Sequence, residues 1–558
     1  MKLCAIINNG LSANACPRTR WHTNRHARCA YVPNVAAPGG QPLSPTAIHR
    51  HDFPSFPSAR SKPVRFDPQK IDAVILSHAH IDHCGLLPKL SRQGFAGQIH
   101  ATSATADLCG VMLPDSAHIQ EIEVEQFNRR AVHRHRAEVE PIYTMADATA
   151  CLKQFHPEQI GQWFAVLPDL RARLWNAGHL LGSASVEVEI TDTGGEVIRL
   201  MFSADIGPDY KLLQSDPEGP SGVDYLICES TYGDRDRIDA NTDRRRALLA
   251  EEVRAAMNPD GALLIPSFAV ERAQELFSDV AQLMDEGVLP VIPIYVDSPM
   301  AAKATDVFAQ HASELENGAT LMHGLRSRQL HFTETREQSM ALDQVQGFHI
   351  VIAASGMCDA GRIRHRLKNW IWREQATVLF TGFQAEGTLG RILQNGARNI
   401  RIQGEEFRVR ARIRSLDLYS GHADATELVQ WIKDRLPLTH DLFLVHGEAA
   451  AIDALAARLD GIVALPHIQR PVLDESFELT AQGLRRLSVP TSPRLAPEKV
   501  ARLDWHNDLS DLFLSINESV GAATDERSRD VLIRRLRRAL AGEEEKPQRG
   551  EDRMRHRR

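Results

Sequence analysis

Five apolar segments of this chain are each accompanied by an imidazole or a carboxylate. IDAVILSH leads to His78, RLMFSADIG to Asp205, VDYLICEST to Glu229 and DLFLVHGE to His446, and His179 lies in a glycine-flanked turn before SASVEVEI. Short apolar runs bounded by polar turns predict buried strands, and functional groups collect in the loops beyond strand ends in layered α/β folds. The pattern therefore predicts an α/β protein whose strand ends meet at one polar site.

The densest of these segments is SHAHIDH, residues 77–83, which places four metal-binding side chains in six consecutive positions. Together with the side chains after the later strands, they form a predicted set of ligands for two metal ions. We assign His78, His80 and His179 to one ion, Asp82, His83 and His446 to the second, and Asp205 as a bridge between them. A lone histidine beside a strand is more often structural, but this motif needs four specified residues together.

The ligand types indicate zinc, which binds imidazole nitrogen and carboxylate oxygen readily. Two zinc ions about 3.5–4 Å apart can share a hydroxide and hold the attacking and leaving oxygens of a phosphate ester. The sequence therefore predicts two Zn²⁺ ions as cofactors and hydrolysis of a phosphodiester as the reaction.

The composition is that of a globular protein with more than one domain. The chain has 558 residues, of which 43% are hydrophobic and 25% are charged, and its formal net charge is -7. A mildly acidic total does not exclude nucleic acid, because a basic groove is a local property. The eight cysteines lack CxxC pairing and no run of 18 apolar residues occurs. We therefore expect a reducing, cytoplasmic location and no membrane span.

The two ends of the chain are unlike the rest. Residues 1–64 are rich in arginine, cysteine and proline, and the first 51 contain no Asp or Glu. We expect this segment to be disordered or to reflect a misread frame or misassigned start. Residues 488–542 predict a helical extension, with an amphipathic basic helix over 529–540, and residues 543–558 predict a disordered charged tail.

Six motifs resemble those of a known family. HAHIDH (78–83), AGHLLGS (177–183) and SADIG (203–207) resemble motifs of the metallo-β-lactamase fold. ESTYGDR (229–235), SGHAD (420–424) and VHGE (445–448) resemble motifs A, B and C of its β-CASP branch, which processes nucleic acids. A histidine at motif C is similar to the RNA-processing members, whereas DNA-repair members usually carry valine there.

The resemblance implies an α/β fold, namely a metallo-β-lactamase αββα sandwich interrupted by an α/β insert. The sandwich would comprise residues 65–235 and 419–487, and the β-CASP domain residues 236–418. Apolar runs followed by helical patterns, as in GALLIPSF before AVERAQELFSDVAQLM, fit such an insert. The active site would lie between the two domains.

The function implied is that of a zinc-dependent RNA phosphodiesterase in RNA processing or decay, acting as an endonuclease, a 5′-exonuclease or both. Single-stranded RNA would be the substrate, and the sequence leaves a homodimer open. His422 would act as general acid, Glu229 would orient it, and Asp82 would be a catalytic residue as well as a ligand. The predicted substrate-binding residues are Arg272, Ser298 and Arg391.

Asp424 and Glu427 predict a capping box that opens a helix just after His422. The positive end of that helix would lower the pKa of His422, whereas Glu229 would raise it, and the sequence does not decide between them.

Two other classes stay open. A non-catalytic RNA-binding scaffold of the same fold would usually lack ligands, whereas all seven are present here. A DNA-acting enzyme or a small-molecule hydrolase of the wider superfamily is the second alternative. Zinc content together with nuclease activity on labelled RNA discriminates among these classes.

Overall fold

The computed structural model describes most of the chain. It describes residues 67–132, 138–192, 194–385, 387–472, 475–488 and 525–540, residue 520, and the short strands β1 (Ile7–Asn8), β2 (Ala30–Tyr31) and β3 (Asn34–Val35). Apart from these strands, the predictions for residues 1–64 and 543–558 lie outside the described residues. Among the described helices, none is both long and apolar enough to cross a membrane.

A four-stranded parallel sheet forms the first layer. Its strands, in order, are β2, β4 (Ala73–Ile75), β5 (Gln98–Thr102) and β6 (Phe155–Glu158). All three residues of β4 are buried, as expected for a strand of a parallel sheet covered on both faces. His78 follows the carboxyl end of β4 after two residues.

A seven-stranded mixed sheet forms the second layer. Its order is β21 (Ile468–Gln469), β20 (Leu442–Val445), β11 (Tyr225–Glu229), β10 (Val197–Phe202), β9 (Ala184–Thr191), β8 (Leu170–Asn176) and β7 (Trp163–Leu167). Strands β10, β11 and β20 are parallel neighbours, so their carboxyl ends share one edge. Asp205, Glu229 and His446 come from this edge, and His179 lies in the turn of the antiparallel hairpin β8–β9.

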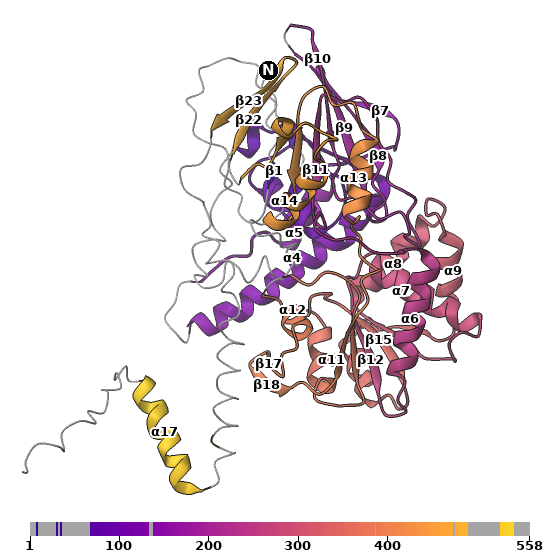
Figure 1. The fold of residues 1–558 in the computed structure, drawn as a ribbon, viewed down its shortest axis with the longest axis vertical. Coiled ribbons are helices and arrows are strands. Elements are labelled where there is room, and N and C mark those ends of the chain that lie inside the picture. Colours follow the sequence, from indigo (N-terminus) through magenta and orange to yellow (C-terminus); the bar gives the residue numbers. More distant parts are fainter. Residues whose placement is uncertain are drawn as a thin grey trace, which may run out of the picture.

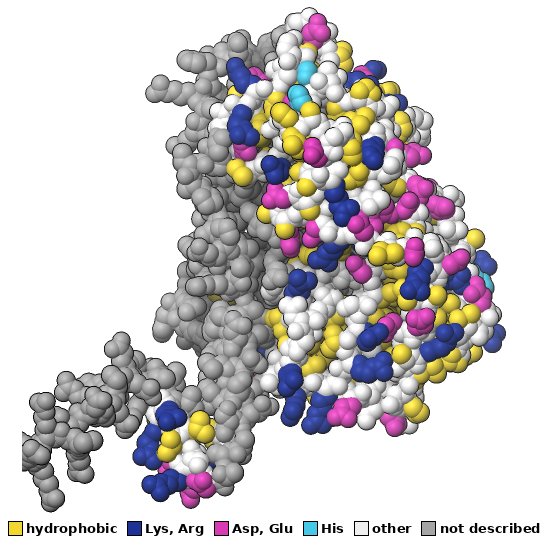
Figure 2. Space-filling model, viewed as in Figure 1, with side chains coloured by type: hydrophobic (Ala, Val, Ile, Leu, Met, Phe, Trp, Pro, Cys, Tyr) yellow, Lys and Arg dark blue, Asp and Glu magenta, His cyan; other side chains and the backbone are white. Residues whose placement is uncertain are grey.

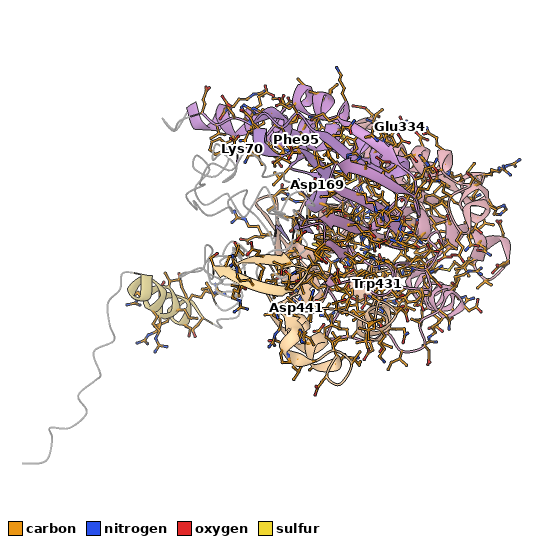
Figure 3. All side chains as sticks on the ribbon, turned by 90° about the horizontal axis from the view of Figure 1, so that it is seen from above. Lys70, Phe95, Asp169, Glu334, Trp431 and Asp441 are labelled. Atoms are coloured by element: carbon orange, nitrogen blue, oxygen red, sulfur yellow. The ribbon has the colours of Figure 1, made fainter. Side chains whose placement is uncertain are left out.

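Three apolar cores hold these layers together. Side chains of both sheets, among them Ile75, Val186 and Phe443, form the core between the sheets. The outer face of the first sheet is covered by α2 (Ile81–Cys84), α3 (Leu87–Arg92), α4 (Ser103–Val132) and α5 (Met145–Leu152). The outer face of the second sheet is covered by α13 (Ala425–Lys433) and α14 (Ala449–Arg458). Phe95 belongs to the first outer core and Trp431 to the second, and Figure 3 shows them on opposite sides of the sheets. The predicted αββα sandwich is confirmed.

A second α/β unit is inserted between β11 and α13. Its six parallel strands, in order, are β14 (Leu330–Phe332), β13 (Ile294–Asp297), β15 (His349–Ala353), β12 (Ala262–Pro266), β16 (Thr377–Phe380) and β19 (Arg412–Ser415). Its helices are α6 (Thr242–Ala256), α7 (Arg272–Asp285), α8 (Pro299–Gln310), α9 (Gly318–Leu325), α10 (Arg336–Ala341), α11 (Ile363–Trp370) and α12 (Leu389–Gln394). In Figure 1 this unit, in magenta to salmon, lies below the sandwich.

The insert forms hydrogen bonds to the loop that follows Asp205. Nη1 of Arg245 donates to the carbonyl of Tyr210 at 2.6 Å, and Glu275 accepts from the backbone N–H of Leu212 at 3.1 Å. Arg245 and Glu275 are buried, and such bonds to buried charged groups are stronger than ordinary ones. The two units are therefore fixed to each other close to the predicted site.

Three smaller features lie apart from the three large sheets. Two hairpins are formed by β17 (Asn399–Ile402) with β18 (Glu405–Arg408) and by β22 (Ser476–Thr480) with β23 (Gly483–Ser488). The predicted basic helix is present as α17 (Glu526–Leu540), which stands apart from both units in Figure 1. On the face shown in Figure 2, basic and acidic side chains are interspersed over both units, and α17 shows mostly basic ones.

Candidate metal centre

Asp205 lies at the centre of the predicted ligands. Its Oδ2 atom is 3.5 Å from Nε2 of His78, 3.3 Å from Nε2 of His83 and 3.7 Å from Nε2 of His179, and its Oδ1 atom is 3.6 Å from Nε2 of His446. These residues come from separate strand ends, so the shared edge of the sheets brings them together. Two zinc ligands at about 2.0–2.1 Å in a tetrahedral arrangement lie roughly 3.4 Å apart, which matches these separations.

The seven predicted ligands fall into two adjacent groups. One group comprises His78, His80, His179 and Asp205, and the other comprises Asp82, His83 and His446. In each group, one ligating atom from every residue lies within 4.8 Å of the others. Asp205 belongs to the first group and also lies beside His83 and His446 of the second. The grouping agrees with the predicted assignment of ligands to two ions, and the binding of ions stays a prediction.

Unpaired polar atoms inside the site test whether a cation fits. Nε2 of His78, both ring nitrogens of His83, Nε2 of His446 and Oδ1 of Asp205 are buried and have no hydrogen-bond partner among the described residues. A buried polar atom without a partner costs free energy, which a bound cation would recover. Imidazole and carboxylate are also the donor types that zinc prefers. The residues present therefore fit a pair of zinc ions.

In two of the predicted ligands, a neighbouring group contacts the ring nitrogen that does not face Asp205. Nδ1 of His78 lies 3.1 Å from the hydroxyl of Ser77, and Nδ1 of His179 lies 2.5 Å from the carbonyl of Gly421. Holding one nitrogen fixes the ring orientation and leaves the other nitrogen for a metal. Gly421 is required for this approach, because a Cβ there would lie 2.9 Å from Cε1 of His179.

Burial keeps most of these imidazoles neutral. Burial and neighbouring histidines lower the pKa of His179 well below its usual value, and burial lowers the pKa of His80 to about 3. For His83, the carboxylates of Asp205 and Asp82 outweigh the effect of burial and raise the pKa to about 9. Neutral imidazole is the form that binds metal, so most of the cluster is ready for a cation at neutral pH.

A histidine–carboxylate pair borders the cluster. Nδ1 of His422 lies 3.1 Å from Oε2 of Glu229, and the His422 ring centroid lies 4.7 Å from that of His179. Burial lowers the pKa of His422, but Glu229 outweighs burial and raises it overall. The predicted capping box is present, because Asp424 accepts from the backbone N–H of Glu427 and Glu427 accepts from that of Asp424.

Arg272 lies near the cluster, on the insert. Its Nε donates to the carbonyl of Tyr419 at 2.9 Å, and its guanidinium stacks on Phe268, whose ring centroid lies 6.5 Å from that of His80. Its Nη1 is buried without a hydrogen-bond partner among the described residues. An unpaired guanidinium nitrogen at this place can donate a hydrogen bond to an anionic group of a substrate.

The other two predicted substrate-binding residues lie at helix ends. Ser298 is buried, and its hydroxyl accepts from the backbone N–H of Ala301 as the N-cap of α8. Arg391 is the third residue of the six-residue helix α12 and is partly buried. Their contact with RNA stays a prediction.

Sequence reasoning missed the residues that support the ligands. Lys211 is buried and donates to the carbonyl of His179 at 2.6 Å, and Glu271 of the insert accepts from the backbone N–H of Leu181 at 3.0 Å. The hydroxyl of Thr231 lies 3.0 Å from Nδ1 of His446. Of these three residues, only Thr231 could have been suspected from the sequence, because it lies two residues after Glu229 within the motif ESTYGDR.

Two further groups of potential ligands are found among the described residues: Asp205, Glu229 and His422 beside the cluster, and a second group away from it. His100, His156 and Glu158 come together on β5 and β6, and Oε1 of Glu158 lies 2.8 and 2.9 Å from Nδ1 of the two histidines. The two histidines and Glu158 therefore satisfy one another by hydrogen bonding, unlike the unpaired atoms around Asp205.

Three domain families match the chain. The Metallo-beta-lactamase superfamily matches residues 51–195, the Beta-Casp domain residues 273–393, and the Zn-dependent metallo-hydrolase RNA specificity domain residues 406–464. The Beta-Casp match lies inside the range predicted for the insert, whose boundaries stay predictions.

Several curated proteins are similar over most of the chain. Ribonuclease TTHA0252 of Thermus thermophilus is 35% identical over 404 residues, which cover 71% of this chain and 86% of that protein. Transcription termination factor FttA is 28% identical over 402 residues in Methanothermobacter thermautotrophicus and 31% identical over 396 residues in Pyrococcus horikoshii. These FttA alignments cover 69% and 68% of this chain but 59% and 57% of the FttA proteins, less than two thirds of their length.

The sandwich, the inserted α/β unit and the histidine–carboxylate cluster define a two-domain metallo-hydrolase. Together with the domain matches and the similarity over 86% of a curated relative, they show that the chain belongs to the β-CASP branch of the metallo-β-lactamase superfamily. The family membership that the six motifs predict is thereby confirmed.

Proposed function

We propose that this chain is a zinc-dependent ribonuclease that hydrolyses phosphodiester bonds of single-stranded RNA. The observation that carries the proposal is the position of Asp205, whose carboxylate faces Nε2 of four histidines at 3.3–3.7 Å. Support for RNA comes from the relative named a ribonuclease and from the match to an RNA specificity domain. The histidine at motif C, His446, favours RNA over DNA by resemblance.

The seven ligands would hold two zinc ions in the two groups described above. Bound zinc would make a water molecule acidic enough to supply hydroxide near neutral pH and would offset negative charge on the phosphate. Asp82 is proposed both as a ligand and as a catalytic residue. Arg272 would bind a phosphate oxygen through its unpaired Nη1.

His422 is proposed as the general acid. Because Glu229 holds Nδ1, Nε2 is the nitrogen that remains to give a proton to the leaving oxygen. Glu229 would fix the ring orientation and favour the protonated imidazole, which is the form a general acid needs. Glu229 is completely buried and accepts from the backbone N–H of Ile206 at 2.5 Å, so its carboxylate is itself held in place.

The alternatives make different predictions for the same protein. A non-catalytic scaffold would bind RNA without cutting it, and the complete ligand set argues against this class because buried unpaired donors are costly without a cation. A DNA-acting enzyme would prefer DNA of the same sequence. A small-molecule hydrolase would leave both nucleic acids intact.

Digestion of single-stranded RNA labelled at either end tests the proposal. We expect zinc-dependent cleavage that a chelator abolishes and added zinc restores, and the two labels separate endonuclease from 5′-exonuclease action. His422→Ala should be nearly inactive, whereas His323→Ala, at a surface ion pair with Asp285, should cut like the wild type. Cleavage of DNA but not RNA, or no cleavage by a zinc-loaded protein, would overturn the proposal.

Two further expectations stay predictions. We propose that the protein acts in the cytoplasm, which cell fractionation would test. Light scattering on the purified protein would test the homodimer.

A further inference from the structure

A chain of hydrogen bonds joins His446 to Glu229 through one hydroxyl group. Oγ1 of Thr231 lies 2.5 Å from Oε2 of Glu229 and 3.0 Å from Nδ1 of His446. The same Oε2 lies 3.1 Å from Nδ1 of His422. One buried carboxylate therefore contacts the proposed general acid directly and a proposed metal ligand through Thr231.

The direction of each bond follows from the number of hydrogens available. The hydroxyl of Thr231 carries a single hydrogen, and the carboxylate of Glu229, the nearest acceptor at 2.5 Å, is a stronger acceptor than the carbonyl of His446 at 3.1 Å. The hydroxyl oxygen is then free to accept, and Nδ1–H of His446 is the donor that faces it. This arrangement leaves Nε2 of His446 without a hydrogen and directed toward Asp205.

Nδ1 of His446 contacts the hydroxyl of Thr231, whereas other groups hold the rings of two of the other ligands. Oε2 of Glu229 is 4.0 Å from Nδ1 of His446, too far for a hydrogen bond. Among the described residues, the Thr231 hydroxyl is the hydrogen-bond partner of that nitrogen. His446 also has a positive φ of 52°, so its backbone conformation is one that most residues avoid.

We propose that Thr231 is a positioning residue that sets the tautomer and orientation of His446 and couples this ligand to the Glu229–His422 pair. The inference rests on the proposed function, in which His446 binds zinc. By accepting from Nδ1–H, the Thr231 hydroxyl keeps Nε2 of His446 without a hydrogen and directed toward Asp205, where it would bind a metal. Partners of this kind typically change metal affinity by about 10- to 100-fold.

Competition for zinc with a chromophoric chelator tests this proposal without any nuclease assay. Thr231→Val keeps the shape of the side chain but removes the hydroxyl, and we expect the zinc site that includes His446 to lose about 10- to 100-fold in affinity. Thr231→Ser keeps the hydroxyl and should bind zinc like the wild type. Cobalt(II) in place of zinc gives a second readout, since the absorption spectrum of one bound ion should change in Thr231→Val alone.

Ser230→Ala is the matched control. Ser230 is adjacent in the chain and fully buried, and its hydroxyl has no hydrogen-bond partner among the described residues. Ser230→Ala removes a buried hydroxyl but keeps the hydrogen bonds that join His446 to Glu229 through Thr231, so zinc affinity should stay at the wild-type value. Circular dichroism of all variants would exclude misfolding as the cause of any change.

Zinc affinity in Thr231→Val equal to that of the wild type would overturn the inference. Equal losses in Thr231→Val and Thr231→Ser would also overturn it, because the hydroxyl would then not be the cause. Failure of the proposed function gives a different result, namely a protein that binds two zinc ions with the predicted Thr231 dependence but leaves RNA uncut.

Discussion

Nδ1 of His422 lies 3.1 and 3.2 Å from the two oxygens of Glu229, although the residues stand 193 positions apart in the sequence. Glu229 is the last residue of β11, and His422 lies in the loop that returns the chain from the insert to α13. The insert therefore starts and ends beside this pair. As a result, the placement of the proposed general acid depends on how the two domains are joined.

Replacing His422 by Ala should lower kcat by about 10²- to 10⁴-fold, the usual contribution of general acid–base catalysis. Zinc content should not change, because His422 is not one of the seven predicted ligands, although it lies beside Asp205 and Glu229. Rates of cleavage of end-labelled RNA under single-turnover conditions, with metal analysis of the same samples, check this. A kcat within twofold of the wild type would exclude His422 as the general acid.

Replacing Arg272 by Ala should weaken RNA binding and reduce its dependence on salt. The loss of one phosphate contact lowers the slope of log affinity against log salt by about 0.7 for a single strand. Affinity is best measured in the His422→Ala background, where RNA stays intact. Arg272→Lys should restore little of the lost RNA affinity. A lysine cannot replace the planar guanidinium, which stacks on Phe268 while donating to Tyr419. An unchanged salt slope in Arg272→Ala would show that this side chain does not contact RNA.

Glu427 should make the folded protein sensitive to pH. Burial and the neighbouring Asp209 raise the pKa of Glu427 to about 8, above its usual value of 4.5. The protonated form is therefore favoured by folding, so this stabilisation is full below pH 4.5 and is lost as pH rises through about 8.

Glu427→Gln removes this titration while keeping a residue that can complete the capping box. The free energy of unfolding of the variant, measured with denaturant, should rise relative to the wild type between pH 5 and pH 8. A constant difference across this range would mean that Glu427 does not titrate there.

Leu444 tests the core that supports the site. It is fully buried on β20, between the second sheet and its covering helices, two residues before His446. Leu444→Ala should lower the free energy of unfolding by about 2–5 kcal/mol, because it leaves a cavity in a packed core. Denaturant unfolding monitored by fluorescence measures this, and a loss below about 1 kcal/mol would contradict the described packing.

The ligands could be predicted from the sequence because their spacing is itself informative. SHAHIDH specifies several ligands within a few positions, and Asp205 and His446 each follow an apolar strand. The apolar runs predicted the strands, and the resemblance of the motifs implied their arrangement in two layers. Parallel pairing of β10, β11 and β20 then places their ends at one edge, as expected for layered α/β folds.

Contacts through space could not be predicted in this way. Thr231 and His446 are 215 positions apart, and hydroxyl residues are too common for their presence to suggest a role. The role of Ser298 in substrate binding stays a prediction, and the cap that its hydroxyl forms on α8 depends on where the helix starts. The sequence did not decide the direction of the His422 pKa shift, because this depends on the 3.1 Å distance to Glu229.

Zinc stoichiometry tests the central claim most directly, namely that seven side chains around Asp205 hold a pair of ions. The purified full-length chain, loaded with zinc and freed of excess metal, should contain about two zinc ions per chain by mass spectrometry of the metal. Asp205→Ala, which removes the carboxylate between the two groups, should lose at least one of them. A wild-type chain that retains no zinc, or an Asp205→Ala variant that retains two with unchanged affinity, would contradict the account.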